Sequence, residues 1–236
     1  MLKLPAAFCF DAETTGLEKP IPVELGATIT VQGKTQVLMN TRCKPGKEIH
    51  PESSEIHGIY EADLKFYPTA KLALGNLITV LEEYSEVLDI ATVGYNSAKF
   101  DGPMLVKMNP GFEVFMACHI DVYALVLRHL THHGTKLITV YESYIGKEAT
   151  DGHAAAYDCL MTMEILHKYM EETNKSYMQI VEELAIPMPY EIFPFGKHQG
   201  VPTSKVPRPY IRYARNNWTD VSADMKATFK YALQGG

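Results

Sequence analysis

Apolar residues occur along the chain in two patterns: short, nearly continuous runs and a helical spacing. The short runs predict the strands. Nearly continuous apolar runs at 4–10, 23–31 and 87–95 have the length of buried strands and are too short to cross a membrane. Polar residues at 32–34 predict a tight turn, after which 35–43 is expected to return as a strand antiparallel to 23–31. The start of the chain is therefore expected to form an antiparallel meander of strands.

Helical spacing of apolar residues dominates much of the remaining chain. Apolar residues at 70, 74, 77, 78 and 81 predict a helix over 69–84. The mixture of strands and helices indicates an α/β domain built on a central mixed sheet. The other expected segments are a helix that opens at 96–101, a strand at 112–119, and helices near 121–130, 136–145 and 154–171.

Two prolines in the segment 186–190 interrupt helix formation and mark a linker. We therefore expect two domains, one spanning 1–186 and a smaller one spanning 191–236. Within the smaller domain we expect a small hairpin around 193–201, followed by helices near 207–216 and 222–234.

Charge is distributed unevenly between these two parts. The chain has a net charge of −6, yet residues 191–236 contain seven Lys or Arg residues against three acids, a net charge of +4, which leaves −10 for residues 1–190. An acidic body that binds divalent cations, joined to a basic tail, is compatible with an enzyme that acts on nucleic acid. The hydrophobic content of 46% and the charged content of 21% are typical of a soluble globular protein.

The four cysteines form no Cys-x-x-Cys pair. This pattern suits a reducing compartment and favours neither a disulfide framework nor a zinc knuckle. The apolar run at the N-terminus leads straight into Asp11 without a small-residue cleavage site, which argues against a signal peptide. We therefore expect a cytoplasmic protein that does not interact with membranes.

The first strand ends in a pair of acids. Asp11 and Glu13 stand two residues apart, so in a strand their side chains point to the same face. Two like charges this close repel one another unless a cation lies between them, and the small residues up to Gly16 would let a ligand approach the backbone. This stretch alone leaves three interpretations open: a metal-binding strand end, two solvated loop acids, or an Asp-Thr-Gly protease loop that lacks its second copy.

Further acids follow downstream, at Asp101 after a buried strand and at Asp158 on the expected late helix. With these acids in place, the sequence resembles the DEDDh branch of the DnaQ-like 3′→5′ exonuclease superfamily. The motifs that match, in order, are Asp-x-Glu-Thr-x-Gly at 11–16, Ile-His-Gly-Ile at 56–59, Phe-Asp at 100–101 and His-x-Ala-x-x-Asp at 153–158.

One of these motifs departs from its commonest form. The usual second catalytic motif reads His-Asn-Ala-x-Phe-Asp, whereas Asn96 and Ser97 stand at its first two positions here. The segment from Gly94 to Asp101 is closer to the variant found in exonuclease I. The acid itself is retained, so the implied metal ligand is unaffected.

The resemblance implies a ribonuclease H-like fold, with a mixed five-stranded sheet flanked by helices. It implies a metal-dependent 3′→5′ exonuclease that hydrolyses phosphodiester bonds and releases nucleoside 5′-monophosphates, with His153 as the general base. Two Mg²⁺ or Mn²⁺ ions would be held by Asp11, Glu13, Asp101 and Asp158. The substrate-binding residues implied are Thr14, Thr15, Gly16, Leu17, His57, Asn96 and Phe100, with a loop-stabilising role as an equal alternative for His57.

The C-terminal segment carries a second resemblance. Phe-Gly-Lys-x-x-Gly at 195–200, followed by Pro-Tyr and Asn-Asn pairs, resembles the tail of the exodeoxyribonuclease X family, which favours DNA as the substrate. The alternative is a small packing module whose aromatic residues form its own core. The residues expected to contact nucleic acid are Lys197, His198, Arg208, Arg212 and Arg215, with Tyr210, Tyr213 and Trp218 as aromatic surface for bases.

Two other functions remain open at the level of the sequence. An exoribonuclease would use the same motifs, because these motifs do not read the 2′-hydroxyl group. A nucleic-acid-binding module could retain the fold without catalysis, although all five catalytic positions hold the expected residue types. Single-stranded and duplex 3′ ends of DNA are both compatible partners, and RNA is a further one.

Overall fold

The computed structural model describes residues 3–150 and 152–234, and its central element is one five-stranded sheet. The strand order is β3-β2-β1-β4-β5, with β2 antiparallel to both β1 and β3, and with β4 parallel to both β1 and β5. This arrangement confirms the predicted mixed five-stranded sheet. The strands are β1 (Leu4–Thr14), β2 (Pro22–Val31), β3 (Lys34–Arg42), β4 (Leu88–Gly94) and β5 (His119–Asp121).

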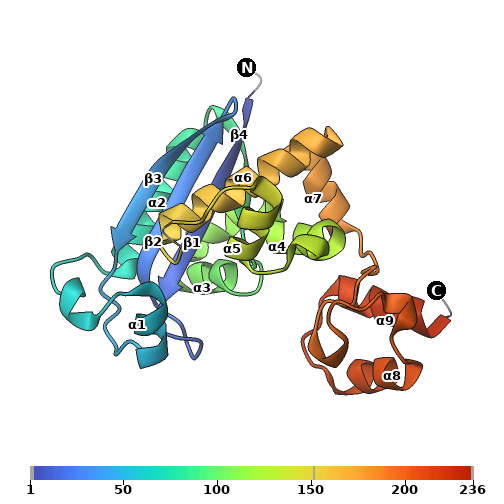
Figure 1. Ribbon diagram of the computed structural model, residues 1–236. Coiled ribbons are helices and arrows are strands. Elements are labelled where there is room, and N and C mark those ends of the chain that lie inside the picture. Colours follow the sequence, from blue (N-terminus) through green and yellow to red (C-terminus); the bar gives the residue numbers. More distant parts are fainter. Residues whose placement is uncertain (1–2, 151, 235–236) are drawn as a thin grey trace.

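Two long helices cover opposite faces of the sheet, as Figure 1 shows: α2 (Ala70–Ser85) on one side and α6 (Ala155–Thr173) on the other. Successive side chains of β1 point to opposite faces of the sheet, so they contribute to two separate apolar clusters. Phe8 belongs to the apolar cluster under α2, whereas Cys9 belongs to the cluster under α6. Since both faces are covered, β1 is apolar along most of its length, as its sequence predicts.

The strand expected over 112–119 is wrong except at its last residue. Residues Pro110–Cys118 form the 3₁₀ helix η2, and only His119–Asp121 pair with β4. Proline and glycine open this segment, and Phe112 packs edge-to-face on Phe10 with 5.2 Å between ring centroids. The apolar residues at 112, 115 and 116 all face the α2 cluster, a spacing that fits a helix better than a strand.

The helices expected from the sequence lie at the predicted positions, whereas the helix Tyr177–Ala185 was not expected. The expected helices near 121–130 and 136–145 each begin as one α-helical turn and continue as a wider π-helical turn. The elements are α1 (Pro51–His57), η1 (Glu61–Leu64), α3 (Asp101–Met108), α4 (Val122–Leu125), η3 (Val126–Leu130), η4 (Thr131–His133), α5 (Leu137–Val140), η5 (Tyr141–Ile145) and α7 (Tyr177–Ala185).

The residues 191–234, which we call the module, form a small helical unit beside the sheet domain (Figure 1). Helices α8 (Arg208–Asn217) and α9 (Ala223–Gln234) follow two short 3₁₀ turns, η6 (Gly196–His198) and η7 (Thr203–Lys205). Instead of a hairpin with two strands, the segment 193–201 forms a turn beside one antiparallel bridge between Ile192 and Pro202.

Close packing explains the Phe-Gly-Lys-x-x-Gly sequence of this turn. Gly196 has a φ angle of +72°, and a Cβ atom there would lie 2.6 Å from the hydroxyl oxygen of Tyr210. The backbone N–H of Lys197 donates a hydrogen bond to the same hydroxyl group. Gly200 also adopts a left-handed conformation, with φ +81°. The motif therefore specifies a tight turn against α8.

One buried arginine joins the module to the sheet domain. Arg128, on η3, forms a two-point ion pair with Asp224 of α9, both distances being 2.7 Å. Its remaining N–H groups donate to the carbonyl oxygens of Glu183, Leu184 and Ile186, where α7 ends. Since Leu127 also belongs to the apolar cluster of the module, the two parts share a packed contact. Within the described residues, no helix combines the length and the apolar composition needed to span a bilayer.

Candidate active site

The two acids of β1 lie on the face of the sheet that α6 covers. Asp11 and Glu13 continue the alternation that places Cys9 in the core under α6. Gly26 of β2 pairs with Asp11, and a Cβ atom at Gly26 would lie 2.2 Å from the backbone of Ala155. Only glycine lets the start of α6 approach the sheet this closely. That approach brings the acid in the first turn of α6 toward the acids of β1.

All four acids named from the sequence have a raised pKa. Burial raises the pKa of Asp11 well above its ordinary value, and the charges of the other three acids raise it further. Burial, followed by the charge of Asp158, raises the pKa of Glu13 to about 8. Burial also raises the pKa of Asp101 to about 7 and that of Asp158 to about 6. The structure thus brings all four into one site whose repulsion bound cations would relieve.

His153 joins this cluster from the loop before α6. A nitrogen of its ring and carboxylate oxygens of Glu13 and Asp158 all lie within 4.8 Å of one another. Its backbone is left-handed, with φ +70°, although it is not a glycine, and its side chain is exposed. Such strained conformations concentrate at functional sites. The imidazole is therefore held at the open edge of the acid cluster, where water has access.

The donor set fits divalent cations that prefer oxygen ligands. The Oδ1 atom of Asp158 is buried and has no hydrogen-bond partner among the residues that the structure describes. A buried carboxylate oxygen without a partner is costly, and a metal ion would satisfy it. Carboxylates without a cysteine suit Mg²⁺ or Mn²⁺ better than zinc. The residues present therefore fit the metal ions that the sequence motifs imply.

A pocket of about 210 Å³ opens beside the acids, and we call it the catalytic pocket. Asp101 contributes to its wall, which links the pocket to the acid cluster. Leu17 is 84% exposed and Phe100 is 50% exposed, so both offer apolar surface to a ligand. Five of the seven expected substrate-binding residues line this pocket: Thr14, Gly16, Leu17, Asn96 and Phe100.

The other two expected substrate-binding residues brace the loop behind the pocket. Thr15 is buried, and its hydroxyl oxygen accepts a hydrogen bond from the N–H of Ile21. The Nδ1 atom of His57 accepts from the N–H of Ile59, which leaves Nε2–H to donate to the carbonyl oxygen of Thr14 at 3.3 Å. Burial lowers the pKa of His57, in keeping with a neutral ring. Both residues therefore hold Thr14 and its neighbours in place.

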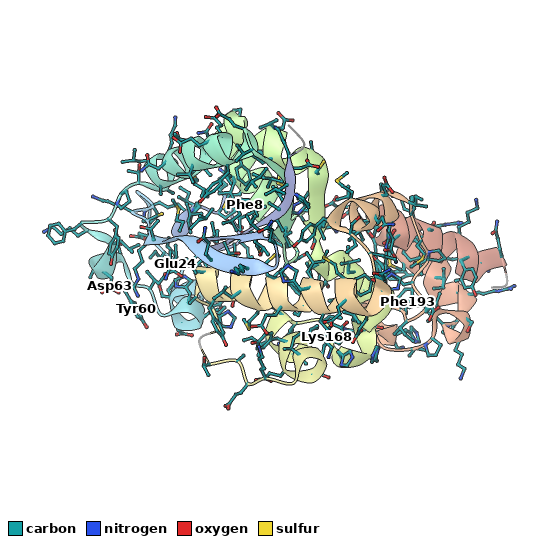
Figure 2. The ribbon with its side chains drawn as sticks, turned by 90° about the horizontal axis from the view of Figure 1, so that it is seen from above. Phe8, Glu24, Tyr60, Asp63, Lys168 and Phe193 are labelled. Atoms are coloured by element: carbon teal, nitrogen blue, oxygen red, sulfur yellow. The ribbon has the colours of Figure 1, made fainter. Side chains whose placement is uncertain are left out.

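Sequence reasoning missed Glu24, which is buried opposite Glu13 in the register of β1 and β2. Its carboxylate accepts a hydrogen bond of 2.9 Å from the N–H of Ala155 and so caps the start of α6. Figure 2 shows Glu24 beside the beginning of that helix. An acid inside an otherwise apolar strand is the signal that could have identified it.

Asp121 is a second missed residue. Its carboxylate accepts hydrogen bonds from the backbone N–H groups of Asn96, Ala98 and Tyr123, so it fixes the loop that leads into Asp101. The hydroxyl of Ser97, in the same loop, lies 3.0 Å from the Nε2 atom of a histidine on β5. Asp121 follows only a short apolar segment, and that local pattern is too weak to predict its role from the sequence.

Most of the tail residues named from the sequence lie on the surface of the module, and one is half-buried. Lys197, Arg208, Arg212 and Arg215 are exposed, and within the described parts of the chain none of them forms an ion pair with a carboxylate. His198 is half-buried against Tyr210, with ring centroids 4.5 Å apart.

Of the aromatic residues expected to be surface for bases, only Tyr213, 58% exposed, is mainly on the surface. Tyr210 and Trp218 pack against Phe193, which Figure 2 shows in the module. Tyr210 is therefore not open stacking surface, because its ring is partly buried and packs against the module core.

Comparison with known proteins identifies a matching family model. Residues 8–166 match the model described as Exonuclease (RNase_T). The chain is also similar to "Exodeoxyribonuclease 10" of Escherichia coli (strain K12), with 25% identity over 230 residues, covering 95% of this chain and 97% of that protein.

Two solved structures have the same fold at low sequence identity. "Exonuclease X in complex with 5′ overhanging duplex DNA" has a TM-score of 0.59 and 22% identity, covering 75% of this chain and 99% of the other. The nuclease domain of 3′hExo, "a DEDDh family member, bound to rAMP", has a TM-score of 0.60 and 12% identity, covering 72% and 93% of the two chains.

Proposed function

This chain belongs to the Exonuclease (RNase_T) family of DnaQ-like 3′→5′ exonucleases, and from that premise we propose that it removes nucleotides from the 3′ ends of DNA. The family uses divalent metal ions, and the chain is a nuclease by this membership. The observation that carries the proposal is a cluster in which three acids act on the charge of Asp11, His153 lies near Glu13 and Asp158, and Asp101 borders an open pocket. The products would be nucleoside 5′-monophosphates.

DNA is the proposed substrate for two reasons. The relative that matches almost the full length of the chain, module included, is described as an exodeoxyribonuclease. The exposed cations of the module would add contacts to phosphates over a length of strand. RNA is the second candidate, because a similar fold occurs in a structure described as bound to rAMP.

The site residues would divide the work of hydrolysis as follows. Asp11, Glu13, Asp101 and Asp158 would hold two Mg²⁺ or Mn²⁺ ions, which when bound supply positive charge to the phosphate and to the leaving oxygen. The imidazole of His153 would accept the proton from the attacking water, whose oxygen forms the new bond to phosphorus. The bond from phosphorus to the 3′ oxygen would break, and that oxygen would take up a proton from solvent, so that the strand is left with a new 3′-hydroxyl.

Positioning of the terminal nucleotide would fall to the catalytic pocket. Leu17 and Phe100 expose apolar surface there, which suits contact with a base. Asn96 has a left-handed backbone, with φ +57°, which turns the chain beside the pocket. The four free cysteines are compatible with a reducing compartment, and we propose a cytoplasmic location on that basis.

A time course on 5′-labelled oligonucleotides tests this function. Single-stranded DNA, blunt duplex DNA and RNA of the same sequence are incubated with the protein and Mg²⁺. We expect ladders that shorten from the 3′ end, with release of mononucleotides and faster shortening of DNA than of RNA. Faster shortening of RNA would transfer the proposal to an exoribonuclease, and internal cuts or no cleavage would contradict it.

A further inference from the structure

A second and larger cavity separates the sheet domain from the module, and we call it the module cavity. Its volume is about 1180 Å³. One wall comes from the loop 96–100 and from η2 and α4, and the other comes from the module, chiefly the loop 217–222. In Figure 1 the module lies beside α4 and below α7, which agrees with these walls.

The module cavity adjoins the catalytic pocket. Asn96 and Phe100 line both spaces, so a strand that left the catalytic pocket on this side would pass Phe100. Phe100 is 50% exposed and stands next to Asp101, at the start of α3. A single strand that leaves the acid cluster on this side therefore reaches the module cavity within its next few nucleotides.

The chemistry of the walls suits unpaired bases better than phosphates. Tyr123, Phe195 and Trp218 supply aromatic surface on both sides. Asp121 also lines the cavity, but its carboxylate is occupied by three backbone N–H groups. Lys99, at the rim, donates a hydrogen bond to the carbonyl oxygen of Asp220 and is exposed. Among the described lining residues Lys99 is thus the one Lys or Arg, beside the exposed acid Asp220, and the aromatic rings supply most of the surface that a base could contact.

We propose that the module cavity binds unpaired nucleobases just upstream of the 3′-terminal nucleotide, so that the substrate is a single-stranded 3′ end. This inference rests on the proposed function, which places that terminal nucleotide in the catalytic pocket. A base that remains paired and stacked within a duplex has both faces and its pairing edge covered. A paired base therefore cannot stack on the aromatic residues of the module cavity, and the cavity should prefer an unpaired strand.

Trp218 is the single tryptophan of the chain and lines the module cavity, so its fluorescence reports on that space. The wild-type protein is titrated in Ca²⁺ buffer with phosphorothioate-linked thymidylates, one a dinucleotide and one of about ten nucleotides. We expect the longer strand to quench Trp218 and the dinucleotide to leave it unchanged, with binding of both followed independently by anisotropy. A blunt duplex should bind without quenching.

A cavity-filling variant tests the same inference through affinity. Ala117 is exposed and lines the module cavity, so Ala117→Phe should weaken binding of the longer strand by roughly 5- to 100-fold, which corresponds to about one stacked base. Binding and hydrolysis of the dinucleotide should be unchanged. Ala62→Phe is the matched control, because Ala62 is exposed and lines neither cavity.

The outcomes separate this inference from the proposed function. Quenching by the longer strand without any hydrolysis in Mg²⁺ would support the cavity and contradict the exonuclease. Hydrolysis with no change in Trp218 fluorescence, or equal quenching by the blunt duplex, would overturn the cavity inference alone. Equal affinity of Ala117→Phe and wild type for the longer strand would also overturn it.

Discussion

Without metal, the acid cluster should destabilise the folded protein as the pH rises, and Glu13 offers the clearest measurement. Its pKa is raised from 4.5 to about 8, which corresponds to about 5 kcal/mol between the two protonation states. Glu13 is only partly buried, and solvent screening reduces this value. We therefore expect ionised Glu13 to lower the free energy of unfolding by about 2–3 kcal/mol at pH 8 and above.

The sign of the effect follows from the raised pKa. Below pH 4.5 the carboxyl of Glu13 is protonated in both the folded and the unfolded chain, so it has no effect on stability. Between pH 4.5 and about 8 the unfolded chain releases the proton more readily, and unfolding becomes progressively easier. Glu13→Gln removes this penalty, because glutamine does not titrate.

The assay compares melting temperatures of wild type and Glu13→Gln in EDTA from pH 4.5 to 8.5. We expect equal values at the acidic end and a variant that melts roughly 5–10 °C higher at pH 8, since about 1 kcal/mol corresponds to 2–4 °C in a chain of this size. Histidines titrate in both proteins, so their effect cancels in the difference. A difference that stays constant across this range would refute the electrostatic account, as would a variant that becomes less stable at pH 8.

Three further predictions follow from the site and the module. His153→Ala should lower turnover by about 10²–10⁴-fold with Mn²⁺ binding retained by calorimetry, and failure to bind Mn²⁺ would contradict its role as general base. Arg128→Ala should lower the unfolding free energy by about 3–5 kcal/mol in denaturant titrations, because Asp224 stays buried without its partner. Lys147→Ala, which breaks an exposed ion pair, should leave the denaturation midpoint nearly unchanged. Replacing the three exposed arginines of α8 with glutamine should reduce the log–log salt dependence of DNA binding by about one unit for every phosphate that an arginine neutralises, and an unchanged slope would make the module a packing unit only.

Truncation of the module is a poorer test than neutralising its charges. A chain that ends at Ala185 would leave Arg128 buried without Asp224 and would expose Leu127, which packs in the module cluster. Any decrease in DNA binding could then come from unfolding at η3. The arginine substitutions leave that ion pair intact, because all three side chains are exposed.

The sequence predicts the sheet well because its signals are local. Strands β1, β2 and β4 are short, mainly apolar runs, and the spacing of Asp11 and Glu13 directly determines their common face. The prediction of a strand at 112–119 was wrong because a short apolar run does not distinguish a strand from a helix. Its packing against Phe10 decides the matter, and that contact spans about a hundred residues.

The residues that support the site depend on contacts that no local pattern records. Glu24 caps a helix that begins at Ala155, 131 residues further along the chain, and Arg128 pairs with Asp224 across 96 residues. The acids themselves could be named because the motif order identifies them. The Trp218 ring illustrates the opposite case, since its aromatic character is evident while its place between a core and a cavity depends on the fold.

The central claim is that the four acids hold the metal ions on which hydrolysis depends. The most direct measurement is the rate of mononucleotide release from a 3′-labelled oligonucleotide by metal-stripped protein as Mn²⁺ is added back, for wild type and Asp158→Asn. We predict no release in EDTA and recovery in wild type with added Mn²⁺. The variant should not recover, because it lacks the negative charge of the Asp158 carboxylate, whose Oδ1 atom is buried without a partner in the wild-type protein. Release in EDTA, or full recovery in Asp158→Asn, would contradict the account.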